Sequence, residues 1–282
     1  MSAALPRLLV IGNSHIAAPR LAYVADSARW PTHDIDFCGL LSGNIGRLEL
    51  RDGVLAPTDP AVAAEMRHYN MVRRLPVTGY DAFAIVGGLG WTGSAQLCAD
   101  HRSLDFPSVI AGDAGCQLVG RRLLDAALRQ RIRGSAALRL LAQLRPLGRP
   151  VLLLPEPMPS AECTADPDRF GAYVDLVARG DAPFWQAWFC RAVAAEAAPG
   201  AVPLFWPDPA REGVAFTRAD LMRGALRLSP HQPEPQPATD YAHGNADYGA
   251  LVMEQIVAAL ASRAAGAGAG AVAGAGPAAA QG

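Results

Sequence analysis

Five short apolar runs constrain the fold of this chain more than any other feature. They span residues 8–11, 35–38, 81–86, 149–154 and 202–206, and each leads within a few residues to a glycine or proline. Segments with helical periodicity alternate with them, at residues 16–28, 61–74, 116–144, 182–198 and 247–261. Alternating buried strands and helices are typical of a parallel sheet covered by helices. The pattern predicts an α/β three-layer sandwich with a central, mostly parallel five-stranded sheet.

Length and composition fit one such domain followed by a tail. The chain has 282 residues, of which 51% are hydrophobic, and a single α/β domain often takes about 200–250 residues. The last stretch, 264–282, is built almost entirely of alanine and glycine. We therefore expect a domain over residues 1–262 and a disordered tail over 263–282.

The charged residues exclude several classes of protein. All 25 basic residues are arginine, so lysine-dependent chemistry is ruled out, including pyridoxal phosphate anchoring, Walker-type nucleotide binding and Ser–Lys dyads. The net charge is −1 and no block of like charge stands out, which indicates neither a nucleic acid nor a membrane as partner.

The cysteine spacing and the apolar runs indicate where in the cell the protein is located. The five cysteines are widely spaced without a CxxC pair, so they indicate neither a disulfide framework nor a zinc site. The N-terminal apolar run is about four residues long, too short for a secretory signal. The long uncharged stretch at the C-terminus is too poor in leucine and isoleucine for a membrane span. We expect a cytoplasmic protein.

Ser14 directly follows the first predicted strand, in the sequence Gly12-Asn13-Ser14-His15. This places it at the carboxyl edge of the sheet, where the next helix directs its N-terminal N–H groups. If Ser14 is a nucleophile, these N–H groups can stabilise the oxyanion that forms beside it. The alternative is that Ser14 simply caps the helix that begins at Ile16.

Asp240 and His243 form a second candidate group, Asp240-Tyr241-Ala242-His243, just before the last predicted helix. A carboxylate three residues before a histidine can turn back and accept the Nδ1–H, which leaves Nε2 free as a base. The alternative is a capping aspartate with a surface histidine. Since both groups belong to the carboxyl edge of one sheet, together they predict a Ser–His–Asp triad.

These motifs resemble the GDSL-like or SGNH hydrolase family. Gly12-Asn13-Ser14 is similar to its first block, with asparagine in place of the usual aspartate, and the Asp240–His243 group is similar to its last block. The resemblance implies a flavodoxin-like hydrolase fold and a reaction that needs no metal or organic cofactor. It also implies oxyanion donors at the Ser14 N–H and at a glycine after the second strand, where Gly39 is the first choice and Gly43 the second.

The third oxyanion donor of that family is an asparagine after the third strand, and this chain has none there. The strand ends instead in Gly87-Gly88-Leu89-Gly90-Trp91. Either the Gly88 N–H or the Asn44 side chain takes that place, or the donor is missing. Loss of one such donor costs about 10²–10³ in rate.

Asn13, His15 and Trp91 are the residues that we expect to line the substrate pocket, because they adjoin the nucleophile or follow the third strand. His15 is equally well explained as a structural histidine. Glu156 follows the fourth strand and has the reach to contact the rim of the site, although a solvated or structural carboxylate is the simpler interpretation.

The predicted function is a serine esterase or acyl transferase acting on a small ester, such as an O-acyl group on a carbohydrate. Two alternatives stay open. One is a protein with this fold that binds but does not catalyse, as the missing asparagine suggests. The other is a nucleotide-binding oxidoreductase, since Gly88–Gly93 matches G-x-G-x-x-G with Asp113 about 20 residues on. The oligomeric state has no signal in the sequence.

Overall fold

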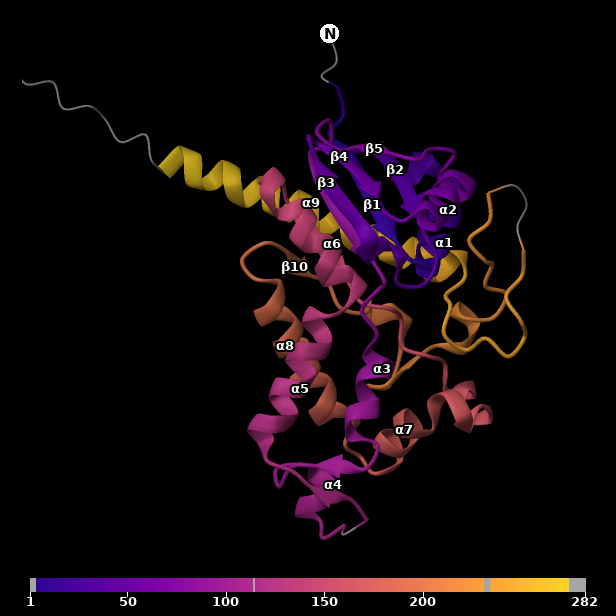
Figure 1. The fold of residues 1–282 in the computed structure, drawn as a ribbon, viewed down its shortest axis with the longest axis vertical. Coiled ribbons are helices and arrows are strands. Elements are labelled where there is room, and N and C mark those ends of the chain that lie inside the picture. The colour runs from indigo at the N-terminus through magenta and orange to yellow at the C-terminus, as the bar shows by residue number, and fades with distance from the viewer. Residues whose placement is uncertain (1–3, 114, 231–233, 274–282) are drawn as a thin grey trace, which may run out of the picture.

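The computed structural model describes residues 4–113, 115–230 and 234–273, and its centre is a sheet of five parallel strands (Figure 1). The strand order is β10-β9-β6-β1-β2. The strands are β1 (Arg7–Gly12), β2 (Asp34–Gly39), β6 (Ala82–Val86), β9 (Val151–Leu154) and β10 (Val202–Pro203). Each overlaps one of the predicted apolar runs, so the α/β class and the five-stranded sheet are confirmed.

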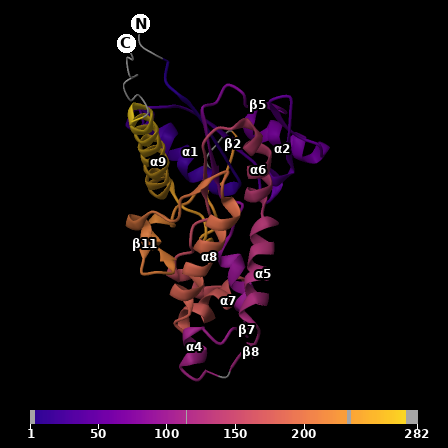
Figure 2. The ribbon, with the colours of Figure 1, turned by 90° about the vertical axis from the view of Figure 1, so that its left-hand side faces the viewer.

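Helices cover both faces of the sheet and complete the three layers. Figure 2 shows α1 (Ala17–Ala25) and α9 (Ala246–Ala273) on one side, with α2 (Pro60–Asn70) and α6 (Ala136–Leu144) on the other. Alternate β1 residues enter opposite cores: Leu8 and Val10 pack in one cluster, Leu9 and Ile11 in the other. Burial on both faces is why β1 is continuously apolar rather than alternating.

A group of helices extends beyond the carboxyl edge of the sheet (Figure 1). They are α3 (Trp91–Ala95), α4 (Pro107–Ile110), α5 (Arg121–Arg133), α7 (Pro167–Ala178) and α8 (Ala182–Ala197). The short strands β7 (His101–Arg102) and β8 (Gln117–Leu118) lie with α4 at the far end (Figure 2).

The region 116–144, predicted to be helical, holds two helices, and its first residues form β8 instead. Gly134 ends α5, and the Ser135 side chain caps α6 by accepting the Leu138 N–H. Helix α7 was not among the predicted helices, although Asp166 at its N-cap and Pro167 in its first turn are recognised start signals.

Two smaller elements flank the sheet. β3 (Leu48–Arg51), β4 (Val54–Pro57) and β5 (Leu75–Pro76) form an antiparallel sheet. Asp52 and Gly53 between β3 and β4 have φ angles of 51° and 75°, as a tight hairpin turn requires. A second pair, β11 (Arg211–Glu212) and β12 (Phe216–Thr217), lies in the long loop before α9.

The last helix runs further than expected. α9 continues to Ala273, past the predicted end at Ala261, while residues 274–282 lie outside the described residues. The division into 1–262 and 263–282 therefore stays a prediction. None of the helices within the described ranges has both the length and the apolar character that a membrane span requires.

Candidate active site

The structure brings Ser14, His243 and Asp240 into one hydrogen-bonded chain at the carboxyl edge of the sheet. Ser14 Oγ lies 2.9 Å from His243 Nε2, across 229 positions of sequence. His243 Nδ1 lies 2.8 Å from Asp240 Oδ2. The three groups stand in the order nucleophile, base and orienter that acyl transfer requires.

The Ser14 hydroxyl does not cap the helix that follows. Asn13 is the N-cap of the 3₁₀ turn η1 (Ser14–Ile16), and its Oδ1 accepts the His15 N–H at 3.2 Å. The capping alternative for Ser14 is therefore filled by its neighbour. The Ser14 side chain is only partly buried, so its hydroxyl has access from solvent.

Asp240 both caps a turn and contacts the base. Its Oδ1 accepts the backbone N–H groups of Ala242 at 2.9 Å and His243 at 3.1 Å. Burial acts to raise the pKa of Asp240. The hydrogen bond and the charge of His243, with the two backbone N–H groups, outweigh that effect and hold the pKa well below its ordinary value. Asp240 is thus a carboxylate at working pH.

His15 lies against the other side of the base. Its ring is stacked on that of His243, with ring centroids 4.3 Å apart and planes 18° apart. Burial first, and then the charge of His243, lower the pKa of His15 well below its usual value. His15 is therefore a neutral ring in contact with the His243 imidazole.

Glu156 belongs to this site, although the sequence favoured a solvated or structural carboxylate. It follows β9, and its Oε1 accepts the Asn13 Nδ2–H at 3.0 Å. Burial raises the pKa of Glu156, and hydrogen bonds from Asn13 and the Gly88 N–H partly offset that rise. Its Oε2 lies 3.9 Å from His15 Nε2, beyond hydrogen-bond distance. The only signal in the sequence was its place directly after a buried strand.

Two of the expected oxyanion donors are occupied within the protein, which corrects the expectation for them. The Gly39 N–H donates to Asn70 Oδ1 at 2.7 Å, and Asn44 Nδ2 donates to Glu65 Oε2 at 2.7 Å. The Gly88 N–H acts on Glu156 by lowering the pKa of that carboxyl. Asn70 comes from the last turn of α2, and no pattern in the sequence predicted that it would reach Gly39.

The Ser14 N–H is the expected donor that stays free. Within the described ranges no acceptor takes it, because it belongs to the first residue of η1. The Gly43 N–H, the second choice beside Gly39, likewise has no acceptor among those residues. Within the described ranges these two expected donors are therefore without a hydrogen-bond acceptor.

Trp91 does not line the site, contrary to expectation. Its side chain is fully buried, and its indole N–H donates to the Tyr173 hydroxyl at 2.9 Å. Its ring also packs against Phe189 and Trp206. The irregular segment after β6 is thus folded into the core by α7 and α8.

The glycine run Gly88–Gly93 gains no support as a dinucleotide site. The helix that follows, α3, is five residues long, shorter than a Rossmann helix. Asp113, the expected ribose ligand, accepts hydrogen bonds from Gly115 N and from the Arg179 guanidinium.

Within the ranges that the structure describes, no three His, Cys, Asp or Glu side chains are grouped so that they could hold a metal ion. Comparison with known proteins adds no relative: no family model and no curated protein matches the chain.

Proposed function

We propose that this protein is a serine hydrolase or acyl transferase of ester bonds, similar to the SGNH family that its motifs resemble. The observation that carries the proposal is the hydrogen-bonded chain from Ser14 through His243 to Asp240. None of the three residues taken alone demands a catalytic role; Asp240, for example, also caps a turn. Their convergence from the two ends of the chain is the reason to assign them chemistry.

In the first step Ser14 Oγ attacks the ester carbonyl carbon while His243 Nε2 takes the hydroxyl proton. The charge on the carbonyl oxygen is held by the Ser14 N–H and, we infer, by the Gly43 N–H. The protonated His243 then gives its proton to the leaving alcohol as the ester C–O bond breaks. Asp240 keeps Nδ1 protonated throughout and stabilises the imidazolium.

In the second step water, or an acceptor alcohol, attacks the acyl-Ser14 ester with His243 again as base. Ser14 is regenerated when its oxygen leaves and takes the proton back. The substrate class we propose is a small acyl group on a carbohydrate or a similar polar alcohol, which rests on the family resemblance.

The test is hydrolysis of p-nitrophenyl acetate and of acetylated sugars by the purified chain. Ser14→Ala should lower kcat by about 10³-fold or more, because the nucleophile is lost. The matched control is Ser262→Ala, which removes an exposed hydroxyl on α9 that bonds only the Ala258 carbonyl. An unchanged rate in Ser14→Ala would overturn the assignment.

The occupied donors favour a second candidate, a binding protein that keeps the fold without the reaction. The Gly39 N–H and the Asn44 side chain both donate to acceptors within the protein. Folded wild-type protein that hydrolyses no ester, yet binds acetylated sugars in a calorimetric titration, would support this candidate. A parallel titration with NAD and NADP tests the glycine run.

A further inference from the structure

His15 contacts the catalytic base through the face of its ring and not through a nitrogen. The stacked geometry, 4.3 Å between centroids and 18° between planes, covers one face of His243. His15 Nδ1 is buried and has no hydrogen-bond partner among the described residues, and Nε2 is 3.9 Å from the nearest carboxylate oxygen. Neither nitrogen is placed to take the proton of Ser14, so His15 is not a second base.

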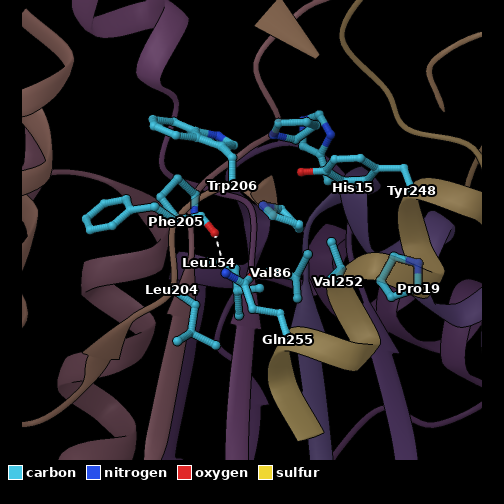
Figure 3. A pocket seen from close by; sticks show the side chains of 13 residues that line it. His15, Pro19, Val86, Leu154, Leu204, Phe205, Trp206, Tyr248, Val252 and Gln255 are labelled. Atoms are coloured by element: carbon cyan, nitrogen blue, oxygen red, sulfur yellow. Dashed lines mark hydrogen bonds between the residues drawn. The ribbon is translucent and has the colours of Figure 1, made fainter. Parts of the chain in front are cut away.

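The backbone of His15 is anchored, and its side chain is largely enclosed. Its backbone N–H is held by Asn13, which Glu156 holds in turn. The ring borders a small, mostly apolar cavity whose wall includes Pro19, Trp206 and Tyr248 (Figure 3). Only 9% of the His15 side chain is exposed. The anchored backbone and the low exposure therefore limit how far the ring can move away from His243.

Burial keeps the His15 ring neutral, and the charges around it modify that effect. His243 and Asp240 lie on the triad side, Glu156 comes from the segment after β9, and the charge of Arg169 acts from α7. Burial and the charges of His243 and Arg169 lower its pKa, and Asp240 only partly opposes them. When His243 becomes an imidazolium, a neutral aromatic face lies against the new charge, which is a favourable arrangement.

We propose that His15 is a positioning residue, whose flat ring braces His243 and keeps Nε2 directed at Ser14. The inference rests on the proposed function and deepens it, because it assigns the ring that sets the orientation of the base. Small displacements of a catalytic group lower kcat strongly, by about 10²-fold for 1 Å.

The experiment compares two substitutions of similar bulk. His15→Phe keeps a flat ring against His243, whereas His15→Leu fills the space without one. With p-nitrophenyl acetate we expect His15→Phe to keep kcat within about threefold of wild type and His15→Leu to lose about tenfold or more, with KM little changed in both. Tyr248→Phe, which alters another residue of the cavity wall, is the control and should leave kcat unchanged.

Equal kcat in wild type and His15→Leu would overturn the proposal, as would a His15→Phe enzyme no better than His15→Leu. A second readout does not depend on turnover. The Nδ1 proton of His243, hydrogen-bonded to Asp240, should give a low-field proton NMR signal that persists in His15→Phe and weakens in His15→Leu. If wild type hydrolyses no ester, this signal still tests the positioning, and an identical signal in all three proteins would overturn it.

Discussion

Asp240 holds His243 through both of its carboxylate oxygens: Oδ1 accepts the His243 backbone N–H at 3.1 Å, and Oδ2 contacts Nδ1 at 2.8 Å. One side chain thus sets the turn that presents the histidine and the tautomer of its ring. With Nδ1 carrying a proton, Nε2 has a lone pair for the Ser14 hydroxyl.

Asp240→Asn separates these two roles. The amide oxygen can still accept the backbone N–H groups, but its NH₂ would donate to Nδ1 and so move the ring proton to Nε2. We expect kcat to fall by about 10⁴-fold with the fold intact. Steady-state kinetics and circular dichroism check this, and a loss of less than tenfold would show that Asp240 does not set the tautomer.

The lowered pKa of His15 makes the free energy of unfolding depend on pH. Its pKa is lowered in the folded state, so its contribution is full above the unfolded pKa of about 6.5 and is lost as pH falls below it. Wild type should lose up to about 1.4 kcal/mol per pH unit relative to His15→Phe on moving down from pH 6.5. Urea denaturation of both proteins at several pH values measures the difference. Parallel curves would mean that His15 is not buried in a neutral form.

Gly87 leaves room for the Asn13 side chain because it has no Cβ. Its φ is +75°, and a Cβ there would lie 2.1 Å from Asn13 Oδ1, the atom that holds the His15 N–H. We expect Gly87→Ala to lower kcat by about 10-fold or more through this displacement.

Gly213→Ala is the matched control for that substitution. Gly213 has φ +61°, but its Cβ would have no neighbour within 4 Å. Its variant should show only the backbone cost of about 1 kcal/mol, with kcat unchanged. Equal kcat losses in the two variants, measured on folded protein, would refute the role of Asn13.

The buried ion pair Arg102–Asp181 joins strand β7 to the start of helix α8. Both side chains are essentially inaccessible, Arg102 Nε lies 2.8 Å from Asp181 Oδ2, and Ser108 donates to the same carboxylate. Asp181→Ala leaves a buried guanidinium without this partner and should cost about 3–5 kcal/mol of unfolding free energy. The exposed pair Arg51–Glu49 is the comparison: Glu49→Ala should cost under about 1 kcal/mol. Denaturant titrations that rank the two in the opposite order would contradict this reading.

The sheet and the meeting of the two ends of the chain could be predicted because both follow from local pattern. Buried parallel strands are continuous apolar runs, and residues after their ends share one edge. That rule suffices for Ser14. For Asp240 and His243, spacing within one turn was enough.

The surroundings of the triad could not be predicted, because they depend on contacts between distant elements. Asn70 at the end of α2 takes the Gly39 N–H, and α7, which was not anticipated, supplies the Tyr173 that draws Trp91 into the core. Likewise, nothing in the sequence near Ser14 indicated that His15 would stack on a residue from the far end of the chain.

In the proposed reaction Ser14 is a nucleophile activated by His243. Covalent labelling of the folded protein by a fluorophosphonate tests this, with the modified residue located by peptide mass spectrometry. We expect labelling on Ser14 alone, abolished in Ser14→Ala and strongly slowed in His243→Ala. Absence of labelling in folded wild type, or labelling that persists in Ser14→Ala, would contradict it.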